Sequence, residues 1–289
     1  MNGIVIVDKP AGWTSQDVTA RLRRVFGTRR IGHGGTLDPM ATGVLPVFVG
    51  RATRGVEFFE HAEKAYETTL IPGITTDTED ITGTVLTKQE VSVTQEQLEA
   101  VLPRFRGEIM QVPPMYSALK VNGQKLCDLA RKGKEIPRQP RPITIFELTL
   151  LGFDNGNPRL RVRCSKGTYI RTLCRDIGQA LGCGGCMGSL RRIQAGDYTL
   201  ADAVPLETLL EAEHPEGYLR SVDTMFRRYP MVKLTGNQEK RCRNGNSFSV
   251  PHPDGTYRAY SQAGEFLMLA KVSAGTMQTV KSFFEPDDK

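Results

Sequence analysis

Residues 32–43, GHGGTLDPMATG, place one carboxylate, Asp38, and one imidazole, His33, in a glycine-rich loop. The preceding residues 21–30 contain five arginines, and the apolar run VLPVFVG follows the loop directly. A single acid held between rigid elements beside positive charge is typical of a working carboxylate in a site for an anionic ligand. The alternative is a structural turn, because Asp-Pro pairs initiate turns and the aspartate often bonds its own backbone. On spacing alone the turn is the favoured interpretation, and Asp38 is a candidate working carboxylate.

A second concentration of charge lies in residues 159–192, which hold eight arginine or lysine residues and one aspartate. Within RLRVRC, Arg159, Arg161 and Arg163 alternate with apolar residues, which predicts a strand with one basic and one apolar face. Three arginines on one sheet face repel one another unless an anion lies there. The pattern favours a nucleic-acid surface, and its alternative is a solvated charged face.

A helix is predicted directly after this strand, because apolar residues recur at helical spacing from 170 to 181 and Gly182 ends the pattern. Arg171 and Arg175 lie one turn apart on another side of that helix. The basic strand therefore leads into a helix whose first turn presents Tyr169 and Arg171.

Cys183 and Cys186 form a CxxC pair, which raises the possibility of a zinc or redox site. A structural zinc site needs a second ligand pair at similar spacing, and the other cysteines and histidines form none. We interpret LGCGGCMG as a tight glycine-rich turn, and we expect neither a metal nor an organic cofactor.

The composition bounds the class of protein. The chain has 289 residues, a formal net charge of +6 and 39% hydrophobic residues, which is enough for a large core. No stretch is apolar enough to span a bilayer. The N-terminus lacks the basic region of a signal peptide, and the thinly spread cysteines suit a reducing compartment. We therefore expect a cytoplasmic protein with free thiols.

The elements that must position these residues follow from local patterns. Strands are expected at 3–7, 66–71, 84–87 and 143–151, with the strands 66–71 and 84–87 joined by a polar turn. Helices are expected at 15–26, after an N-cap at Thr14 or Ser15, and at 94–105, which opens with the capping box Thr94-x-x-Gln97. Between the helix at 94–105 and the strand at 143–151 we expect a Pro-Pro loop at 110–120, a short helix ending at Gly133 and a rigid turn at 138–142. Because strands and helices do not alternate strictly, we expect an α+β fold with a mixed sheet.

The sequence after residue 228 has a different texture. Short strand patterns with Gly, Asn and Pro turns recur at regular spacing, which is typical of a small β-barrel or sandwich. The sequence thus predicts two domains, at 1–228 and 229–289.

Several motifs occur in an order that resembles the bacterial TruB family, the tRNA pseudouridine synthases that modify the T-loop uridine. They are VDKP at 7–10, GHGGTLDPMATGVLP at 32–46, KAYETT at 64–69, MYSALK at 115–120, RPI at 141–143, CSKGTYIRT at 164–172 and LRR at 190–192. The resemblance covers the first 200 or so residues, and the C-terminal part is similar, less specifically, to the family's PUA-like domain. It implies a pseudouridine synthase fold with an RNA-binding, thumb-like segment at about 110–142.

The resemblance also implies roles for individual residues. Asp38 matches the catalytic aspartate, Tyr66 the tyrosine against the target base and Arg171 the arginine paired with the aspartate. His33 matches the histidine that enters the T-loop where the flipped base stacked. Lys9, Asp80, Tyr169 and Leu190 match further residues of the substrate site, and the RNA backbone is expected at Arg141, Arg161, Arg163 and Lys166.

The implied reaction cuts the bond between N1 and C1′ of uridine, rotates the base and rejoins it at C5. A carboxylate can take part at C1′ or at the base, and the sequence does not choose between them. The forked, always charged guanidinium of Arg171 would hold such an acid ionised. The implied partner is the T-arm of tRNA, bound by a monomer without a membrane or an obligatory protein partner.

The chain departs from the family pattern at Gly34, Arg54 and Cys186, where the family usually has threonine, lysine and histidine. None of these is in the Asp38, Tyr66, Arg171 set. Two other functions stay open: a non-catalytic module that binds or folds tRNA, and a related synthase that acts on another RNA.

Overall fold

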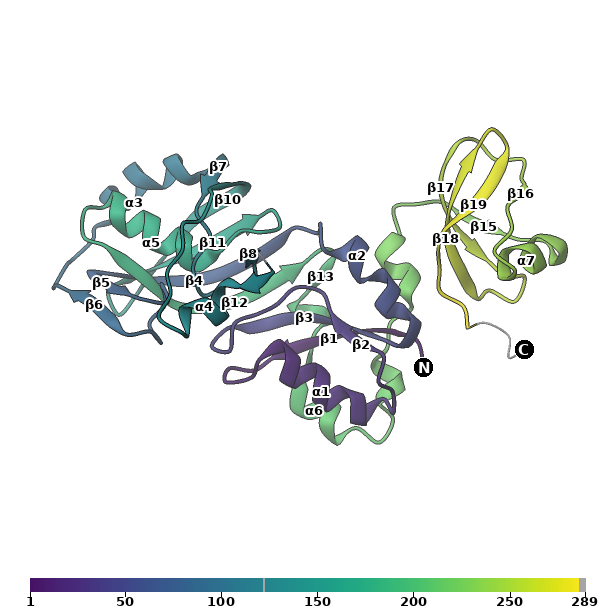
Figure 1. Ribbon diagram of the computed structural model, residues 1–289, viewed down its shortest axis with the longest axis horizontal. Coiled ribbons are helices and arrows are strands. Elements are labelled where there is room, and N and C mark those ends of the chain that lie inside the picture. Colours follow the sequence, from purple (N-terminus) through teal and green to yellow (C-terminus); the bar gives the residue numbers. More distant parts are fainter. Residues whose placement is uncertain (122, 286–289) are drawn as a thin grey trace.

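The computed structural model describes residues 1–121 and 123–285, and its centre is a ten-stranded mixed sheet (Figure 1). The order along the sheet is β14, β1, β3, β12, β4, β11, β10 and β7, with β13 beside β12 and β2 beside β3. The strands are β1 (Gly3–Lys9), β2 (Ile31–His33), β3 (Thr42–Val49), β4 (Lys64–Pro72), β7 (Gly107–Gln111), β10 (Arg141–Asp154), β11 (Asn157–Cys164), β12 (Gly185–Ala195), β13 (Tyr198–Thr199) and β14 (Val204–Pro205).

Both strand directions occur in this sheet. The pairs β1–β14 and β12–β3 are parallel, and the remaining pairs are antiparallel. The helices lie beside the sheet rather than in regular alternation with its strands. The expected α+β class is therefore confirmed.

The helices are α1 (Ser15–Val25), α2 (Val56–Phe59), α3 (Gln95–Val101), α4 (Leu126–Ala130), α5 (Ile170–Ala180), α6 (Leu206–Glu211) and α7 (Gly236–Arg243). Of the helices described, α1, α3 and α7 begin at a threonine cap. Thr14 caps α1 in a reciprocal pair with Asp17, and Thr94 does the same for α3 with Gln97. Among the described residues, no helix is long and apolar enough to cross a membrane.

Two expectations about these elements are wrong in detail. The helix expected at 94–105 ends at Val101 and continues as a 3-10 turn, Leu102–Phe105, because Pro103 has no backbone N–H to donate. The strand at 84–87 does not pair with the strand that contains Tyr66. The partner of β6 (Val85–Lys88) is the short strand β5 (Ile74–Thr76), which leaves β4 between β11 and β12 at the centre of the large sheet.

Residues 112–140 leave the sheet between β7 and β10. They form α4 and a small hairpin of β8 (Lys120–Val121) and β9 (Gln124–Lys125) beside the central sheet (Figure 1). Leu126 anchors this excursion with a buried side chain.

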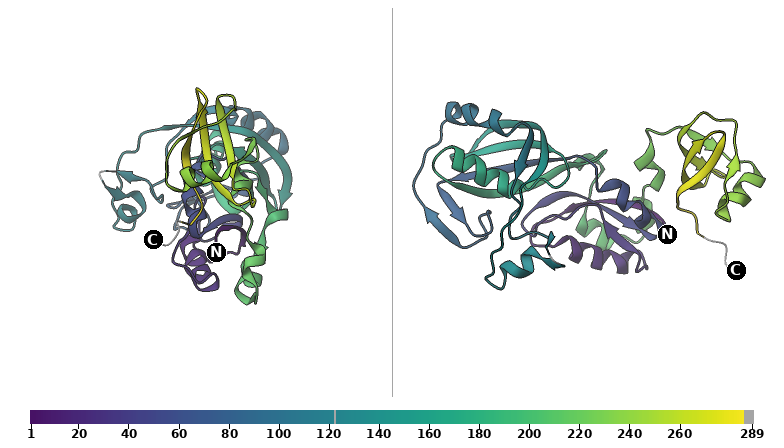
Figure 2. Two further views of the ribbon diagram at one scale, coloured as in Figure 1. Left: turned by 90° about the vertical axis from the view of Figure 1, so that its right-hand side faces the viewer. Right: turned by 45° about the horizontal axis from the view of Figure 1, so that its top comes forward.

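A second sheet of five strands follows, and Figure 2 shows it standing apart from the first. Its order is β15 (Met231–Lys233), β17 (Gly255–Tyr260), β18 (Phe266–Ser273), β19 (Thr276–Ser282) and β16 (Phe248–Ser249). It has its own hydrophobic core, which includes Leu267, Val272 and Met277. A separate aromatic cluster of Phe226, Phe266 and Phe283 joins this unit to the preceding chain.

Candidate active site

The loop between β2 and β3 carries Asp38, and the start of α1 holds that loop in place. The Ser15 hydroxyl accepts from the Leu37 N–H at 2.9 Å and donates to the Leu37 carbonyl at 3.2 Å. The Asp38 carbonyl accepts from Ala41 N–H, so the expected turn is present. The turn uses the backbone carbonyl of Asp38 rather than its carboxylate, and 35% of the side chain is exposed. The turn and the catalytic interpretation of Asp38 are thus compatible.

Arg171, in the first turn of α5, is the partner of that carboxylate. Its Nε lies 2.9 Å from Asp38 Oδ2, and its Nη2 donates to Asp38 Oδ1 at 3.4 Å. The arginine is 7% exposed, and its other donors reach the carbonyls of Thr78 and Tyr116 at 3.0 and 2.8 Å. Because the guanidinium is fixed by two carbonyls as well, it presents a charge of set direction to a partly open acid.

Asp80 is a second carboxylate near the same guanidinium, with Oδ2 3.9 Å from Arg171 Nε. Its Oδ1 is taken up within its own turn by the hydroxyls of Thr78 and Thr82 and by the Thr82 N–H. Asp80 is 5% exposed, so it orients Arg171 from inside the protein.

Tyr66 lies on β4, opposite Val162 of β11 and Arg192 of β12. The tyrosine is buried, and burial raises the pKa of its hydroxyl, an effect that the nearby Arg192 charge partly opposes. The hydroxyl is therefore protonated at neutral pH, and the ring offers an aromatic surface rather than a base.

His33 ends β2 beside the Asp38 loop. Burial and the Arg192 charge lower the pKa of its imidazole, which is therefore neutral at pH 7. Its Nε2 lies 3.4 Å from Gln16 Nε2, and its buried Nδ1 has no hydrogen-bond partner among the described residues. A neutral imidazole ring is suited to stacking with a base.

Lys9 contacts the Asp38 loop from inside the protein. The side chain is completely buried, and its ammonium donates to the carbonyls of Pro10, Trp13 and Pro39 at 2.9, 2.6 and 3.3 Å. A buried ammonium must spend its donors on acceptors of the protein. Burial lowers the pKa of Lys9 to about 8, and the Asp38 charge opposes that shift. Lys9 thus ties the residue after Asp38 to the loop that precedes α1.

Two other expected residues lie just before α5 and on β12. Tyr169 immediately precedes α5, and burial raises the pKa of its hydroxyl. Leu190 is 8% exposed and packs in the main core that also contains Tyr66. Asp38, Tyr66, Arg171, Tyr169 and Leu190 therefore come from one loop, two strands and one helix end that meet at the centre of the sheet.

The arginines of the basic strand are paired with glutamates. Arg161 lies opposite Glu67 of β4 and donates to it at 2.7 Å, and Arg163 donates to Glu63 at 2.6 Å. Opposed residues share a face, so these arginines lie on the side of the sheet away from Tyr66 and α5. Glutamates therefore supply the anions that this face requires, and the electrostatic argument for RNA there no longer holds. Sequence patterns could not find these partners because they lie about a hundred residues away.

Arg141 and Lys166, which were expected to contact the RNA backbone, are both exposed. Arg141 begins β10 opposite Gln111, where its charge lies close enough to Tyr169 to affect that hydroxyl. Lys166 lies in the loop before α5, with Nζ 3.3 Å from His61 Nε2. Neither residue has an acidic partner within the described residues.

Two buried residues support the site without a sequence signal that identified them. Arg192 is 1% exposed and donates to the carbonyls of Val44 and Gly35, which holds the start of the Asp38 loop. The Gln111 amide bonds both backbone groups of Tyr169, at 2.9 and 3.1 Å, and so fixes the beginning of α5. Arg192 belongs to the LRR motif, but the motif alone did not predict that this residue lies opposite Tyr66 in the neighbouring strand.

Gly34 has a steric explanation. A Cβ at this position would lie 2.5 Å from Phe59 Cδ1 and 3.1 Å from Phe48 Cε2. The Phe59 ring therefore occupies the space that the usual threonine would need.

Cys183 and Cys186 lie in and after a turn formed by Gly182 and Gly184, both at positive φ. Within the described residues, no three histidine, cysteine or acidic side chains gather as a metal site would require.

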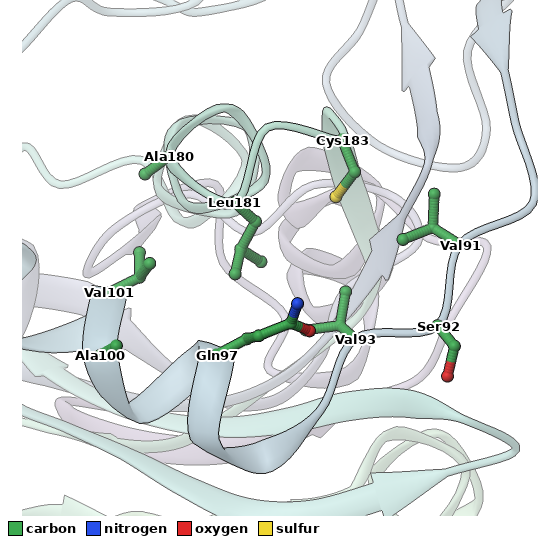
Figure 3. Close-up of a pocket in the computed structure, with 9 residues that line it drawn as sticks. All are labelled: Val91, Ser92, Val93, Gln97, Ala100, Val101, Ala180, Leu181 and Cys183. Atoms are coloured by element: carbon green, nitrogen blue, oxygen red, sulfur yellow. The ribbon is translucent and has the colours of Figure 1, made fainter.

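A cavity of about 260 Å³ lies elsewhere, between α3 and the end of α5 (Figure 3). Apolar side chains such as Val93 and Leu181 line it, together with Gln97 and Cys183, and it contains no acid. Leu181 follows Arg171 by ten residues, about 15 Å along a helix. This cavity is therefore not the site of the Asp38 carboxylate.

Comparisons with known proteins identify the family of this chain. The family model "TruB family pseudouridylate synthase (N terminal domain)" matches residues 23–170, and "tRNA pseudouridylate synthase B C-terminal domain" matches residues 171–223. These matches define the chain as a pseudouridylate synthase. The chain belongs to the TruB family.

Three relatives named tRNA pseudouridine synthase B illustrate the similarity. The one from Stutzerimonas stutzeri (strain A1501) is 44% identical over 94% of this chain and 92% of its own. The one from Dechloromonas aromatica (strain RCB) is 47% identical over 87% and 85%, and the one from Francisella philomiragia is 42% identical over 99% and 96%.

Solved structures show the same fold at lower identity. An H/ACA RNP bound to a substrate RNA containing 2′-deoxyuridine has a chain with a TM-score of 0.74 and 23% identity, matched over 99% of this chain and 86% of that one. A chain of a Cbf5–Nop10–Gar1 complex gives 0.74 and 24%, over 98% and 85%. The expected fold is thus confirmed for both sheets.

Proposed function

We propose that this protein isomerises uridine to pseudouridine at position 55 in the T-loop of tRNA, with Asp38 as the nucleophile. The observation that carries the proposal is the Asp38 carboxylate, held by Arg171 at 2.9 Å and still 35% exposed. Such an acid is charged, oriented and open to a ligand. The relatives named tRNA pseudouridine synthase B support the same substrate and reaction.

The reaction breaks the bond between N1 and C1′, forms one between C5 and C1′, and moves the C5 proton to solvent while N1 gains one. Asp38 acts by adding to C1′ or to the base and leaves again when the new bond forms. The balance of atoms requires no metal, oxidant or organic cofactor.

The neighbouring residues provide charge and an aromatic surface. Arg171, anchored by two carbonyls, keeps the Asp38 carboxylate directed at the reacting centre. Tyr66 lies against the flipped uracil, and the neutral His33 takes the place of that base in the RNA stack. Flipping costs about a few kcal/mol, which these contacts offset.

RNA binding in this proposal uses the segment 110–142 and the C-terminal unit. The segment contains seven arginine or lysine residues and two acids, and Arg141 with Lys166 extends its charge toward Tyr169. Residues 1–228 would form the catalytic domain, and residues 229–289 a small PUA-like domain that contacts the same tRNA. A monomer that works on tRNA in the cytoplasm is the simplest arrangement.

The proposal is tested by mapping pseudouridine in the tRNAs of a bacterial strain that lacks its own enzyme for position 55. Expression of the chain should restore pseudouridine at position 55. Expression of Asp38→Asn should not restore it. Pseudouridine at other RNA positions, with none at 55, would assign the chain to another RNA target.

A further inference from the structure

Helix α5 holds the turn at residues 78–80 at two levels. At the first level, Arg171 donates to the Thr78 carbonyl at 3.0 Å and lies 3.9 Å from the Asp80 carboxylate. At the second level, the Thr172 hydroxyl donates to Glu79 Oε2 at 2.6 Å, and Arg175 donates to Glu79 Oε1. Glu79 lies between Thr78 and Asp80, the two residues that Arg171 contacts. It is thus bound separately by other side chains of the same helix.

Glu79 has an unusual backbone. Its φ is +65°, in the left-handed region that residues other than glycine rarely adopt. Such a conformation persists only when the surrounding structure over-determines it. Glu79 is 9% exposed, and its backbone carbonyl also accepts from Met187 N–H at 3.0 Å, which ties the turn to β12.

The reversal at Glu79 has a consequence for the active site. It lets the carbonyl before it and the carboxylate after it converge on one guanidinium, that of Arg171. Without the two side-chain bonds to Glu79, the turn can relax toward ordinary φ values, and these two acceptors separate. Arg171 would then lose part of the frame that directs it at Asp38.

We propose that Glu79, Thr172 and Arg175 form a positioning clamp that orients the Arg171 guanidinium for the reaction at Asp38. The clamp touches neither the carboxylate nor the substrate, so its members are positioning residues. This inference rests on the proposed function, because it concerns the rate of that reaction.

The clamp predicts a loss in kcat with little change in KM. We expect Glu79→Ala to reduce kcat for tRNA about 10- to 100-fold, because displacement of about 1 Å at a catalytic group costs that much, while KM stays within about twofold. Thr172→Val removes the hydroxyl at nearly constant volume and should act in the same direction. Thr172→Ser keeps the hydroxyl and should retain most of the wild-type kcat.

A double-mutant cycle separates positioning from a loss of stability. If Glu79 acts through Asp80 and Arg171, Glu79→Ala should cost little further kcat in an Asp80→Asn background. Kinetics are measured by tritium release from tRNA labelled at uridine C5, at a temperature where thermal unfolding shows each variant folded.

The clamp is refuted if Glu79→Ala and Thr172→Val keep kcat within about twofold of wild type, if they change only KM, or if the Asp80 and Glu79 effects add fully. If Glu79→Ala does not fold, the valine and serine variants at Thr172 decide. A wild-type protein that releases no tritium refutes the proposed function instead.

Discussion

At the scale of single residues, the site depends on how each charge is held. Asp38 is partly open, whereas its partners Arg171 and Asp80 are almost buried. The Asp38 carboxylate is therefore accessible to a substrate, while the buried groups that orient it are held in fixed positions by the protein. Tyr66 and His33 are both neutral at pH 7, because burial raises the pKa of the tyrosine hydroxyl and lowers the pKa of the imidazole. The reaction thus has one exposed ionised group at its centre.

The lowered pKa of Lys9 predicts that the activity is sensitive to alkaline pH. Its pKa is lowered from its ordinary value to about 8, so the ammonium is present below that pH and loses its proton as pH rises through it. Deprotonation removes a donor from the carbonyls that hold the Asp38 loop. We expect kcat to fall above about pH 8. In Lys9→Met, we expect a low kcat without this alkaline limb. A wild-type kcat that stays flat from about pH 7 to 9 would contradict this role of Lys9.

At the scale of elements, the site is assembled by packing that fixes one loop against a sheet. Gly34 is a tight point of this loop, because the Phe59 ring occupies the place of a side chain. Arg192 and Lys9 bind the two sides of the same loop through carbonyl oxygens. The loop is thus held by steric contact and by buried cations together.

Substitution of Gly34 tests the steric part. Gly34→Ala should destabilise the protein by about 1–3 kcal/mol and reduce kcat, because the new Cβ forces Phe59 or the loop to shift. Phe59→Leu should recover part of both losses in the double variant. Denaturant unfolding and tritium release measure the two quantities, and a stable, fully active Gly34→Ala would refute the packing explanation.

The ion pairs of β11 change which arginines should contact RNA. Arg141→Gln should weaken tRNA binding and reduce the slope of log K against log salt by about 1, as the loss of one phosphate contact does. Arg161→Gln, the matched control, removes an arginine already paired with Glu67 and should leave the slope unchanged. Filter binding at several salt concentrations distinguishes them, and equal slopes for both variants would contradict this assignment.

Local patterns predicted the elements whose causes are local. The caps at Thr14 and Thr94, the strand 159–164 and the helix after it all appeared where the sequence placed them. The partners of Arg161 and Arg163 could not be predicted, because register between β4 and β11 brings them from far away in the chain. Burial of Lys9 and the contact of Gly34 with Phe59 also arise only from tertiary packing. The motif resemblance named the residues that meet at Asp38, but the geometry came from the fold.

At the scale of the whole molecule, an aromatic cluster fixes the second sheet to the rest of the chain. Phe226 packs against Phe58, Phe266 and Phe283, and the Tyr260 hydroxyl donates to Asp223 at 2.6 Å. Lys281 of β19 also forms an ion pair with Glu57 of α2. These contacts hold the small domain in one orientation, as a surface for a large RNA would require.

Weakening this junction should affect substrate size more than chemistry. Phe226→Ala should cost about 3–5 kcal/mol of stability at the junction and raise KM for intact tRNA, because the second RNA contact loses its fixed position. A T-arm hairpin, which we expect to reach the catalytic domain alone, should show little change in KM. Equal losses on the two substrates would contradict a role for the second domain in binding intact tRNA.

The central claim is that the Asp38 carboxylate performs the isomerisation. Single-turnover tritium release from tRNA labelled at uridine C5 tests it most directly, with Asp38→Asn compared with a change of an exposed acid at the end of β10, Asp154→Asn. Asp38→Asn should reduce the rate by more than about 1,000-fold while tRNA binding persists, and Asp154→Asn should match wild type. An Asp38→Asn protein that binds tRNA and releases tritium at the wild-type rate would contradict the account.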